Sequence, residues 1–319
     1  MSSTVGTSDE VDAVQRSLST GAPAWCSYYG VTCGAVSGSA TYESVILISL
    51  YGLSLTGTIP NSIGSLSSLI VLDLNTNKLT GTISSSIGSL SSLTYLKINA
   101  NSLAGTIPSS IGSLTSLQIL ELGTNRLTST IPSSISSLTS LLVLNLYTNR
   151  LTGTIPSSIG SLTSLTSLWL YSNSLNGTIP SSIGLLSKLV RAGLDANKLT
   201  GTIPSSIGSM SSLTGLALPT NKLSGTIPST FSKLSSMSYL HLDTNYLTMG
   251  SATTVPNSTF SSTTLSGTLV LDNNCLAFHY GSISVSATHC APTSGKSIML
   301  CEYAYEYVLI RKLFYCELK

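Results

Sequence analysis

Residues 151–174 read LTGTIPSSIGSLTSLTSLWLYSNS, and this 24-residue unit recurs with few changes along most of the chain. An asparagine near the end of the unit marks the period, because it returns every 24 residues without a slip. A fixed period of this length predicts a solenoid, in which each repeat forms one turn and packs only against its neighbours. The ladder asparagines are Asn77, Asn101, Asn125, Asn149, Asn173, Asn197, Asn221 and Asn245.

The leucines of each unit follow the spacing Leu-x-x-Leu-x-Leu-x-x-Asn-x-Leu, as in residues 69–79. Leu72 and Leu74 are two residues apart, so they share one face of a short strand and should both point into the core. Strands of neighbouring turns should pair into a parallel sheet on the concave side. The ladder asparagine has enough donors and acceptors to satisfy backbone groups where the chain turns inside, which predicts a structural role for it.

The element Leu-x-Gly-x-Ile-Pro, at residues 151–156 and 199–204 for example, resembles the plant-type leucine-rich repeat. That family includes the ectodomains of plant receptor-like kinases and receptor-like proteins, and the polygalacturonase-inhibiting proteins. The resemblance covers residues 44–276, where a degenerate first turn and a stretched last turn bring the total to about ten turns of 24 residues. It implies an α/β repeat solenoid, a right-handed superhelix with a parallel concave β-sheet and a short second sheet formed by the Gly-x-Ile segments.

The two ends of a solenoid need caps, because a terminal repeat cannot leave its apolar face in water. Residues 1–43 are similar to the N-terminal cap of the family, with helix-like spacing at 11–18, and this implies a Cys26–Cys33 disulfide. Residues 277–295 should form the C-terminal cap, with Cys275–Cys290 as the corresponding disulfide. Residues 296–319 fit neither pattern, and we expect an atypical, disordered tail or a gene-model artefact there.

Composition excludes several classes of function. Charged residues make up 8% of the chain and the formal net charge is +2, so no field suited to nucleic acid is present. No apolar run of about 18 residues suggests a transmembrane helix. The six cysteines fall in close pairs, which suits an oxidising compartment, although the N-terminus has no secretory signal. We expect an extracellular or cell-surface protein with a truncated start, or a fragment of a larger receptor.

The sequence shows no pattern typical of a metal site, a phosphate-binding loop or an activated nucleophile. Asp73 and Glu121 occupy equivalent positions two turns apart, a separation that could suit a pair of glycosidase carboxylates. Lys97 lies between them, however, and a solvated charge cluster is the simpler interpretation. We therefore predict a recognition module with no enzymatic activity, no cofactor and no metal.

The outward-facing positions of the concave strands differ most from turn to turn, which indicates a surface for specific recognition. Tyr147, Trp169 and Tyr171 stand out, because aromatic platforms edged by hydrogen-bonding groups suit peptide anchors or sugar rings. Exposed aromatics without a function remain the alternative. The expected partner is a protein or peptide, with a cell-wall polysaccharide next. The predicted partner-binding residues are Tyr95, Glu121, Asn145, Tyr147, Trp169, Tyr171, Arg191 and Asp195.

A second surface is predicted from the Thr-Gly-Thr element, whose threonines should face the same way. Stacked turns would form a flat two-column array, spaced about 6.7 Å along each strand and about 4.8 Å between strands. This resembles the Thr-x-Thr surfaces of β-solenoid ice-binding proteins, and some plant ice-binding proteins are leucine-rich-repeat proteins, so ice binding is the alternative function. Recent duplication of the repeats would also explain the uniformity. The array comprises Thr56, Thr58, Thr80, Thr82, Thr106, Thr128, Thr130, Thr152, Thr154, Thr178, Thr200, Thr202 and Thr226.

Two sequons, Asn176-Gly-Thr and Asn257-Ser-Thr, predict N-glycosylation if the protein is secreted. A glycan on Asn176 would interrupt the threonine array.

Overall fold

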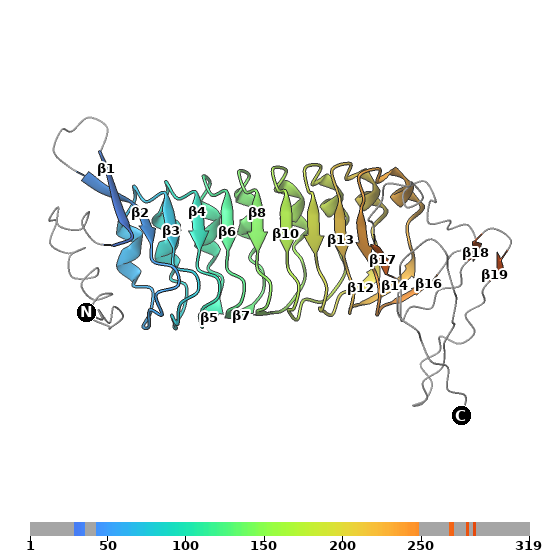
Figure 1. Cartoon of the computed structure of the whole chain (residues 1–319), viewed down its shortest axis with the longest axis horizontal. Helices are drawn as coiled ribbons and strands as arrows, with labels where there is room; N and C mark the ends of the chain where they lie inside the picture. Colours follow the sequence, from blue (N-terminus) through green and yellow to red (C-terminus); the bar gives the residue numbers. More distant parts are fainter. Residues whose placement is uncertain (1–28, 36–42, 249–267, 271–278, 281–282, 285–319) are drawn as a thin grey trace, which may run out of the picture.

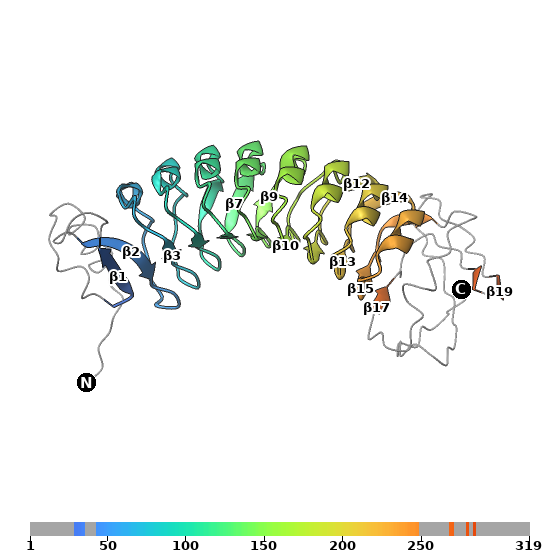
Figure 2. The same cartoon turned by 90° about the horizontal axis from the view of Figure 1, so that it is seen from above.

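A computed structural model describes residues 29–35, 43–248, 268–270, 279–280 and 283–284 of the chain. Successive turns stack side by side along one axis, and from above the stack is curved into an arc (Figures 1 and 2). The predicted solenoid is confirmed, and a sheet lines its inner side.

The concave sheet contains eleven strands in the order β1-β2-β3-β4-β6-β8-β10-β11-β13-β15-β17. From β2 onward they pair in parallel, and from β2 to β15 each residue pairs with the one 24 positions later, as Asp73 does with Lys97. The last pair is shifted by the insertion after residue 250, so that Tyr239 faces Thr268. The strands are β2 (Glu43–Ser49), β3 (Val71–Asp73), β4 (Tyr95–Lys97), β6 (Ile119–Glu121), β8 (Val143–Asn145), β10 (Ser167–Trp169), β11 (Arg191–Gly193), β13 (Gly215–Ala217), β15 (Tyr239–His241) and β17 (Thr268–Val270).

The N-terminal edge of this sheet is covered by β1 (Val31–Ala35), which pairs antiparallel with β2 and has an irregularity between Thr32 and Cys33. An added strand of this kind protects the open edge of a sheet. The predicted helix at 11–18, the disulfide partner Cys26, the pair Cys275–Cys290, the sequon at Asn257 and the tail 296–319 lie outside the described residues and stay predictions.

The outer side of each turn carries a short 3-10 helix, so the helical element of the α/β repeat is tighter than an α-helix (Figure 2). A proline usually precedes it and fixes an extended entry, as Pro156 does with φ −64° and ψ 136°. Where Ser84 replaces that proline, its hydroxyl accepts a hydrogen bond from Ser86 N. These helices are η2 (Asn61–Ser65), η3 (Ser85–Ser89), η4 (Ser109–Ser113), η5 (Ser133–Ser137), η6 (Ser157–Ser161), η7 (Ser181–Leu185), η8 (Ser205–Ser209) and η9 (Ser229–Lys233).

The predicted second sheet is present as two three-stranded pieces joined by isolated bridges. One piece contains β5 (Ala104–Thr106), β7 (Arg126–Ser129) and β9 (Arg150–Leu151). The other contains β12 (Thr200–Thr202), β14 (Lys222–Thr226) and β16 (Tyr246–Thr248). A two-stranded pair, β18 (His279–Tyr280) with β19 (Ile283–Ser284), lies beyond the repeats. The handedness of the superhelix stays a prediction.

The interior is a continuous column of leucine and isoleucine, in which Leu72, Leu96 and Leu120 have no exposed surface. The ladder asparagines line this column, as predicted. The side-chain amide of Asn101 donates to Leu74 O at 3.0 Å and to Ile98 O at 3.2 Å, while its Oδ1 accepts from Leu79 N at 2.9 Å. Each asparagine therefore satisfies backbone groups of its own turn and of the preceding turn, and none is left for ligand binding.

Candidate functional site

The predicted partner-binding residues all lie on the concave sheet or just after its strands, as expected. The strands alternate between half-buried outer residues and a fully buried leucine, so the predicted side chains stand on the solvent side of the core. Arg191 is exposed, and the other seven are partly buried. The sheet therefore holds the whole set on one stiff surface.

Three of these residues form an aromatic cluster, which we define as Tyr147, Trp169 and Tyr171. The rings of Tyr147 and Tyr171 are stacked with centroids 4.7 Å apart and planes within 1°. The indole of Trp169 meets Tyr171 edge-on at 6.3 Å and 83°. Both geometries are favourable for aromatic pairs, so the cluster is preorganised without a ligand.

Two glycines of the concave columns seat this cluster. A Cβ added at Gly193 would lie 2.8 Å from Cε3 of Trp169, and one added at Gly123 would lie 3.0 Å from Cε1 of Tyr147. Each ring therefore lies over a glycine of a neighbouring turn, where no side chain stands in its way. These glycines thus leave room for the aromatic rings. Comparison of the columns in the sequence did not show this role, because it depends on the direction of the side chains.

The remaining predicted residues surround the cluster unequally. Asn145 is adjacent, since its Oδ1 accepts from Tyr147 N at 3.4 Å. Asp195 lies beside the cluster, since its Oδ1 is 3.4 Å from the Cβ position of Gly193, which Trp169 also approaches. Burial raises the pKa of Tyr171, and the nearby Tyr147 and the charge of Asp195 raise it further. Tyr95 and Glu121 stand on β4 and β6 and make no ring or ion-pair contact with the cluster within the described part of the chain.

A second group, which the sequence reasoning left out of the site, lies at the C-terminal end of the same surface. The Tyr239 hydroxyl and Nδ1 of His241 share a hydrogen bond of 2.8 Å, and their rings are 4.0 Å apart. Burial lowers the pKa of His241, against the opposing effects of Asp243 and Asp195. Burial also raises the pKa of Tyr239, assisted by the same two carboxylates. These residues occupy the same variable outward-facing columns of the sequence, and that position was the signal that could have assigned them to the site.

The electrostatics of this end centre on Asp195. Burial raises the pKa of its carboxyl and the charge of Asp243 raises it further, while its own backbone N–H and His241 act in the opposite direction. No ion pair neutralises Asp195 or Asp243 among the described residues. Two carboxylates thus face the concave side without a cationic partner there.

The carboxylates considered for glycosidase chemistry lie as predicted, with Lys97 between Asp73 and Glu121 across β3, β4 and β6. The amide of Asn75 donates a hydrogen bond to Oδ1 of Asp73. No group of three or more potential metal-ligating side chains occurs in the described ranges. The same ranges contain no helix long and apolar enough to cross a membrane.

The threonine surface differs from the predicted array in its register. All thirteen threonines are exposed, but each second threonine pairs with the first position of the next turn, as Thr58 does with Thr80 and Thr178 with Thr200. Equivalent threonines are therefore offset by two residues along the strand, which separates them by roughly 8 Å rather than one strand spacing. The two straight columns of the predicted array are therefore wrong, because strands of the second sheet pair each residue with the one 22 positions later instead of 24.

The uniformity of these threonines has a packing explanation. A Cβ added at Gly177 would lie 2.7 Å from Cγ2 of Thr154, so the methyl of the second threonine packs on the glycine of the next turn. Several first-position hydroxyls are also engaged, as in the 3.1 Å hydrogen bond from Thr80 Oγ1 to Gly57 O. The exposed Asn176 pairs with Thr154 in this strip, where a glycan would interrupt it.

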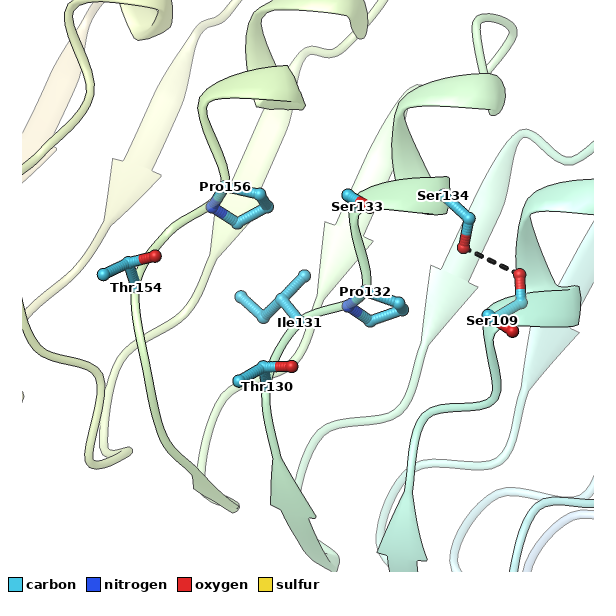
Figure 3. A pocket seen from close by; sticks show the side chains of 8 residues that line it. All are labelled: Ser109, Thr130, Ile131, Pro132, Ser133, Ser134, Thr154 and Pro156. Atoms are coloured by element: carbon cyan, nitrogen blue, oxygen red, sulfur yellow. Dashed lines mark hydrogen bonds between the residues drawn. The ribbon is translucent and has the colours of Figure 1, made fainter.

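A shallow depression of about 450 Å³ lies on this outer side (Figure 3). Thr130 and Thr154 border it from successive turns, and Pro132 and Pro156 lie next to them. Ser134 Oγ donates to Ser109 O at 2.7 Å at its far end. The depression presents small hydroxyls and proline rings without a charged group.

Comparisons with known proteins agree with this geometry. The family model described as "Leucine-rich repeat region" matches residues 47–191, and the one described as "Leucine rich repeat" matches residues 187–247. No curated protein matches the chain.

Among solved structures, the chain is similar to the leucine-rich-repeat ectodomain of the plant membrane receptor kinase GASSHO1/SCHENGEN3 from Arabidopsis thaliana, in complex with CASPARIAN STRIP INTEGRITY FACTOR 2. The two are 37% identical with a TM-score of 0.71, over 79% of this chain and 32% of that chain. For the Arabidopsis receptor kinase HAESA, in complex with the peptide hormone IDA and the co-receptor SERK1, the identity is 30% and the TM-score 0.59, over 83% and 53% of the chains.

A plant ice-binding protein is 28% identical with a TM-score of 0.65, over 79% of this chain and 78% of that chain. The present chain thus spans about a third to a half of the receptor ectodomains, and most of the ice-binding protein.

Proposed function

The chain belongs to the plant-type leucine-rich-repeat proteins, and we propose from this that it is a non-enzymatic recognition module whose concave sheet binds a peptide segment. The observation that carries the proposal is the aromatic cluster of Tyr147, Trp169 and Tyr171, stacked in the middle of that sheet. The likeness to ectodomains solved with CASPARIAN STRIP INTEGRITY FACTOR 2 and with the peptide hormone IDA supports it. We further propose an extracellular location, in which Asn176 is glycosylated and the predicted disulfides form.

The physical reason for this choice is the stiffness of the surface. The strands are held by leucines with no exposure, and the rings are held by one another and by the glycines beneath them. Little side-chain entropy is then lost on binding, which leaves more of the contact energy for affinity. Tyrosine and tryptophan are also frequent energetic centres of interfaces.

The test begins with a phage-displayed library of random peptides selected on the full chain. For a selected peptide, Trp169→Ala should weaken binding by about 2 kcal/mol or more, roughly 30-fold, because it removes the edge-on ring of the cluster. Isothermal titration calorimetry measures the dissociation constant.

Tyr51→Ala is the matched control, because Tyr51 is an exposed aromatic in the same column as Tyr147 and Tyr171 but lies at the first repeat strand. It should leave the affinity within about twofold. Unchanged binding by Trp169→Ala contradicts the peptide assignment. Trp169-dependent binding of oligogalacturonides alone would replace the peptide by a cell-wall polysaccharide.

Ice binding is the second candidate function. Two observations favour it: the threonine strip is exposed, and the similarity to the plant ice-binding protein extends over most of both chains. Two observations count against it. The offset register breaks the straight columns of equivalent threonines, and the packing of the threonine methyls on glycine gives another reason for their uniformity.

An ice recrystallisation assay on the wild-type chain decides this candidate. If activity is present, Thr130→Val with Thr154→Val should reduce it, because valine keeps the methyl packing and removes the exposed hydroxyls. Absence of activity in the wild type ends the ice-binding hypothesis.

A further inference from the structure

The charges on the concave sheet are distributed unevenly along the solenoid. On the N-terminal strands, Asp73, Lys97 and Glu121 alternate in sign across adjacent strands, and Asp73 also accepts a hydrogen bond from Asn75. On the C-terminal strands, Asp195 and Asp243 carry the same sign. The first group has a cation between its two anions and sums to −1, whereas the second pair sums to −2 with only Pro219 between the two aspartates.

The turn between Asp195 and Asp243 contributes only short side chains to this surface. Pro219 is the residue of that turn in the same column, and Gly215 and Ala217 precede it on β13. The two aspartates are two strands apart, so their backbones are separated by roughly 9.6 Å. A group placed midway would be about 5 Å from either strand, which one aspartate side chain and one hydrogen bond can span.

The nearest fixed cation in these columns does not occupy that position. Arg191 begins β11, four residues before Asp195, which places it roughly 13 Å away along the strand. Its Cγ instead lies 3.8 Å from the Cβ position of Gly215. His241 is the other basic group of this region, and its Nδ1 is engaged with the Tyr239 hydroxyl.

Aromatic rings flank the acidic pair on both sides. Trp169 lies over Gly193, which ends β11 two residues before Asp195. Oδ1 of Asp195 is 3.4 Å from the Cβ position of that glycine. On the other side, Tyr239 and His241 are in ring contact on β15. Carboxylates beside aromatic faces favour an organic cation, since both attract it and the rings exclude water.

We propose that the peptide partner carries an arginine or lysine side chain that binds between Asp195 and Asp243, close to an apolar residue that rests on the aromatic cluster. This inference rests on the proposed peptide-binding function and specifies its ligand. Burial, and after it the charge of Asp243, raises the pKa of Asp195, which agrees with a carboxylate that forms no ion pair in the described part of the chain.

The geometry also sets the spacing of the two ligand residues. Pro219 follows β13, which is two strands from the β10 strand of Trp169, or roughly 9.6 Å along the solenoid axis. An extended peptide covers about 3.3–3.6 Å per residue. The basic residue should therefore lie about two to four residues from the aromatic, proline or aliphatic anchor.

The same random-peptide selection tests this, with the full chain as bait. Peptides whose binding depends on Trp169 should be enriched in arginine or lysine at that spacing. If Trp169-dependent peptides show no such enrichment, the inference is wrong while peptide binding stands. If no selected peptide depends on Trp169, the proposed function itself is wrong.

A double-mutant cycle then assigns the contact. A selected arginine peptide should lose 10-fold or more in affinity for Asp195→Asn and for Asp243→Asn, whereas its glutamine counterpart should change less than twofold. Asp73→Asn is the matched control and should affect neither peptide. Equal effects on both peptides would overturn the assignment, provided that the thermal midpoints show each variant to be folded.

Discussion

At the scale of single residues, Ser129 breaks a rule that the neighbouring turns follow. It has φ 69°, in the left-handed region, where the equivalent positions such as Gly153 are glycine with φ 72°. A serine there carries a conformational cost, because residues with a Cβ rarely adopt this region.

Ser129→Gly should therefore relieve strain and stabilise the protein by about 1 kcal/mol. The greater freedom of glycine in the unfolded chain offsets part of this gain. Gly153→Ser is the reciprocal variant and should destabilise by about 1–3 kcal/mol, because its Cβ would lie 2.7 Å from Cγ2 of Thr130. Urea unfolding curves measure both free energies. A destabilising Ser129→Gly would contradict the assignment of strain.

Asp195 predicts a pH dependence of stability. Its pKa is raised in the folded state by burial and by Asp243, so the folded state favours the protonated carboxyl. The contribution of this group is then fully present below its unfolded pKa and is lost as the pH rises through its raised folded pKa. Asp195→Asn should be more stable than the wild type at pH 7 and equal to it near pH 3, where both side chains are neutral.

Urea unfolding of the two proteins at several pH values measures that difference, which removes the titrations that do not depend on Asp195. The charge of Asp195 also raises the pKa of His241, so the change between pH 3 and pH 5, below the usual range of a histidine, is the decisive one. A difference of the same size at every pH would show that the carboxyl does not titrate in the expected direction.

At the scale of elements, the 3-10 helices of neighbouring turns pack backbone to backbone. A Cβ added at Gly160 would lie 2.5 Å from Ser182 O. At the equivalent position Ser136 already carries a side chain, and there the hydrogen bond from Ser158 Oγ to Ser133 O lengthens to 3.2 Å, compared with 2.5 Å from Ser182 to Ser157.

Gly160→Ala should consequently cost about 1–3 kcal/mol, since the backbone oxygen cannot move aside as a flexible side chain would. Ser136→Ala is the matched control and should change the free energy of unfolding by less than about 0.5 kcal/mol, because the neighbouring helix has already made room. Differential scanning calorimetry compares their midpoints. Equal losses in the two variants would argue against this packing.

The same elements show what the sequence could predict. The concave columns are correct, because the period fixes which residues recur outward and this sheet pairs equivalent positions, such as Lys97 with Glu121. The register of the second sheet could not be derived, because the period does not determine how far neighbouring strands slide past each other. Thr58 pairs with Thr80 only in the folded, curved stack.

The candidate site was predicted to a similar extent. Tyr147 and Tyr171 occupy one column in adjacent turns, so their proximity followed from the repeat. The seating of Trp169 on Gly193 required side-chain directions that a periodic pattern does not contain. His241 and Asp243 occupy the same variable columns, but they lie three turns from Trp169 and Tyr171, so the aromatic pattern did not join them to the site.

At the scale of the whole molecule, the turns are nearly interchangeable units. Removing residues 102–125, one full period, joins Asn101 to Arg126 and preserves every position of the repeat. Because each turn interacts mainly with its neighbours, this variant should fold cooperatively with a lower thermal midpoint.

Removal of residues 102–113, half a period, is the control, since it places polar positions where leucines belong and should prevent cooperative folding. Circular dichroism and size-exclusion chromatography distinguish the two results. Cooperative folding of both variants would contradict the nearest-neighbour description.

The asparagine ladder gives the stack a polarity. The side chain of Asn125 donates to Ile98 O and accepts from Leu103 N, so each turn depends on the asparagine that follows it. As far as this ladder is concerned, loss of a turn from the C-terminal side leaves buried backbone groups of the preceding turn without their asparagine, whereas loss from the N-terminal side leaves only side-chain amide bonds unmade. Fraying should therefore advance from the C-terminal end, toward the strands that hold the aromatic cluster.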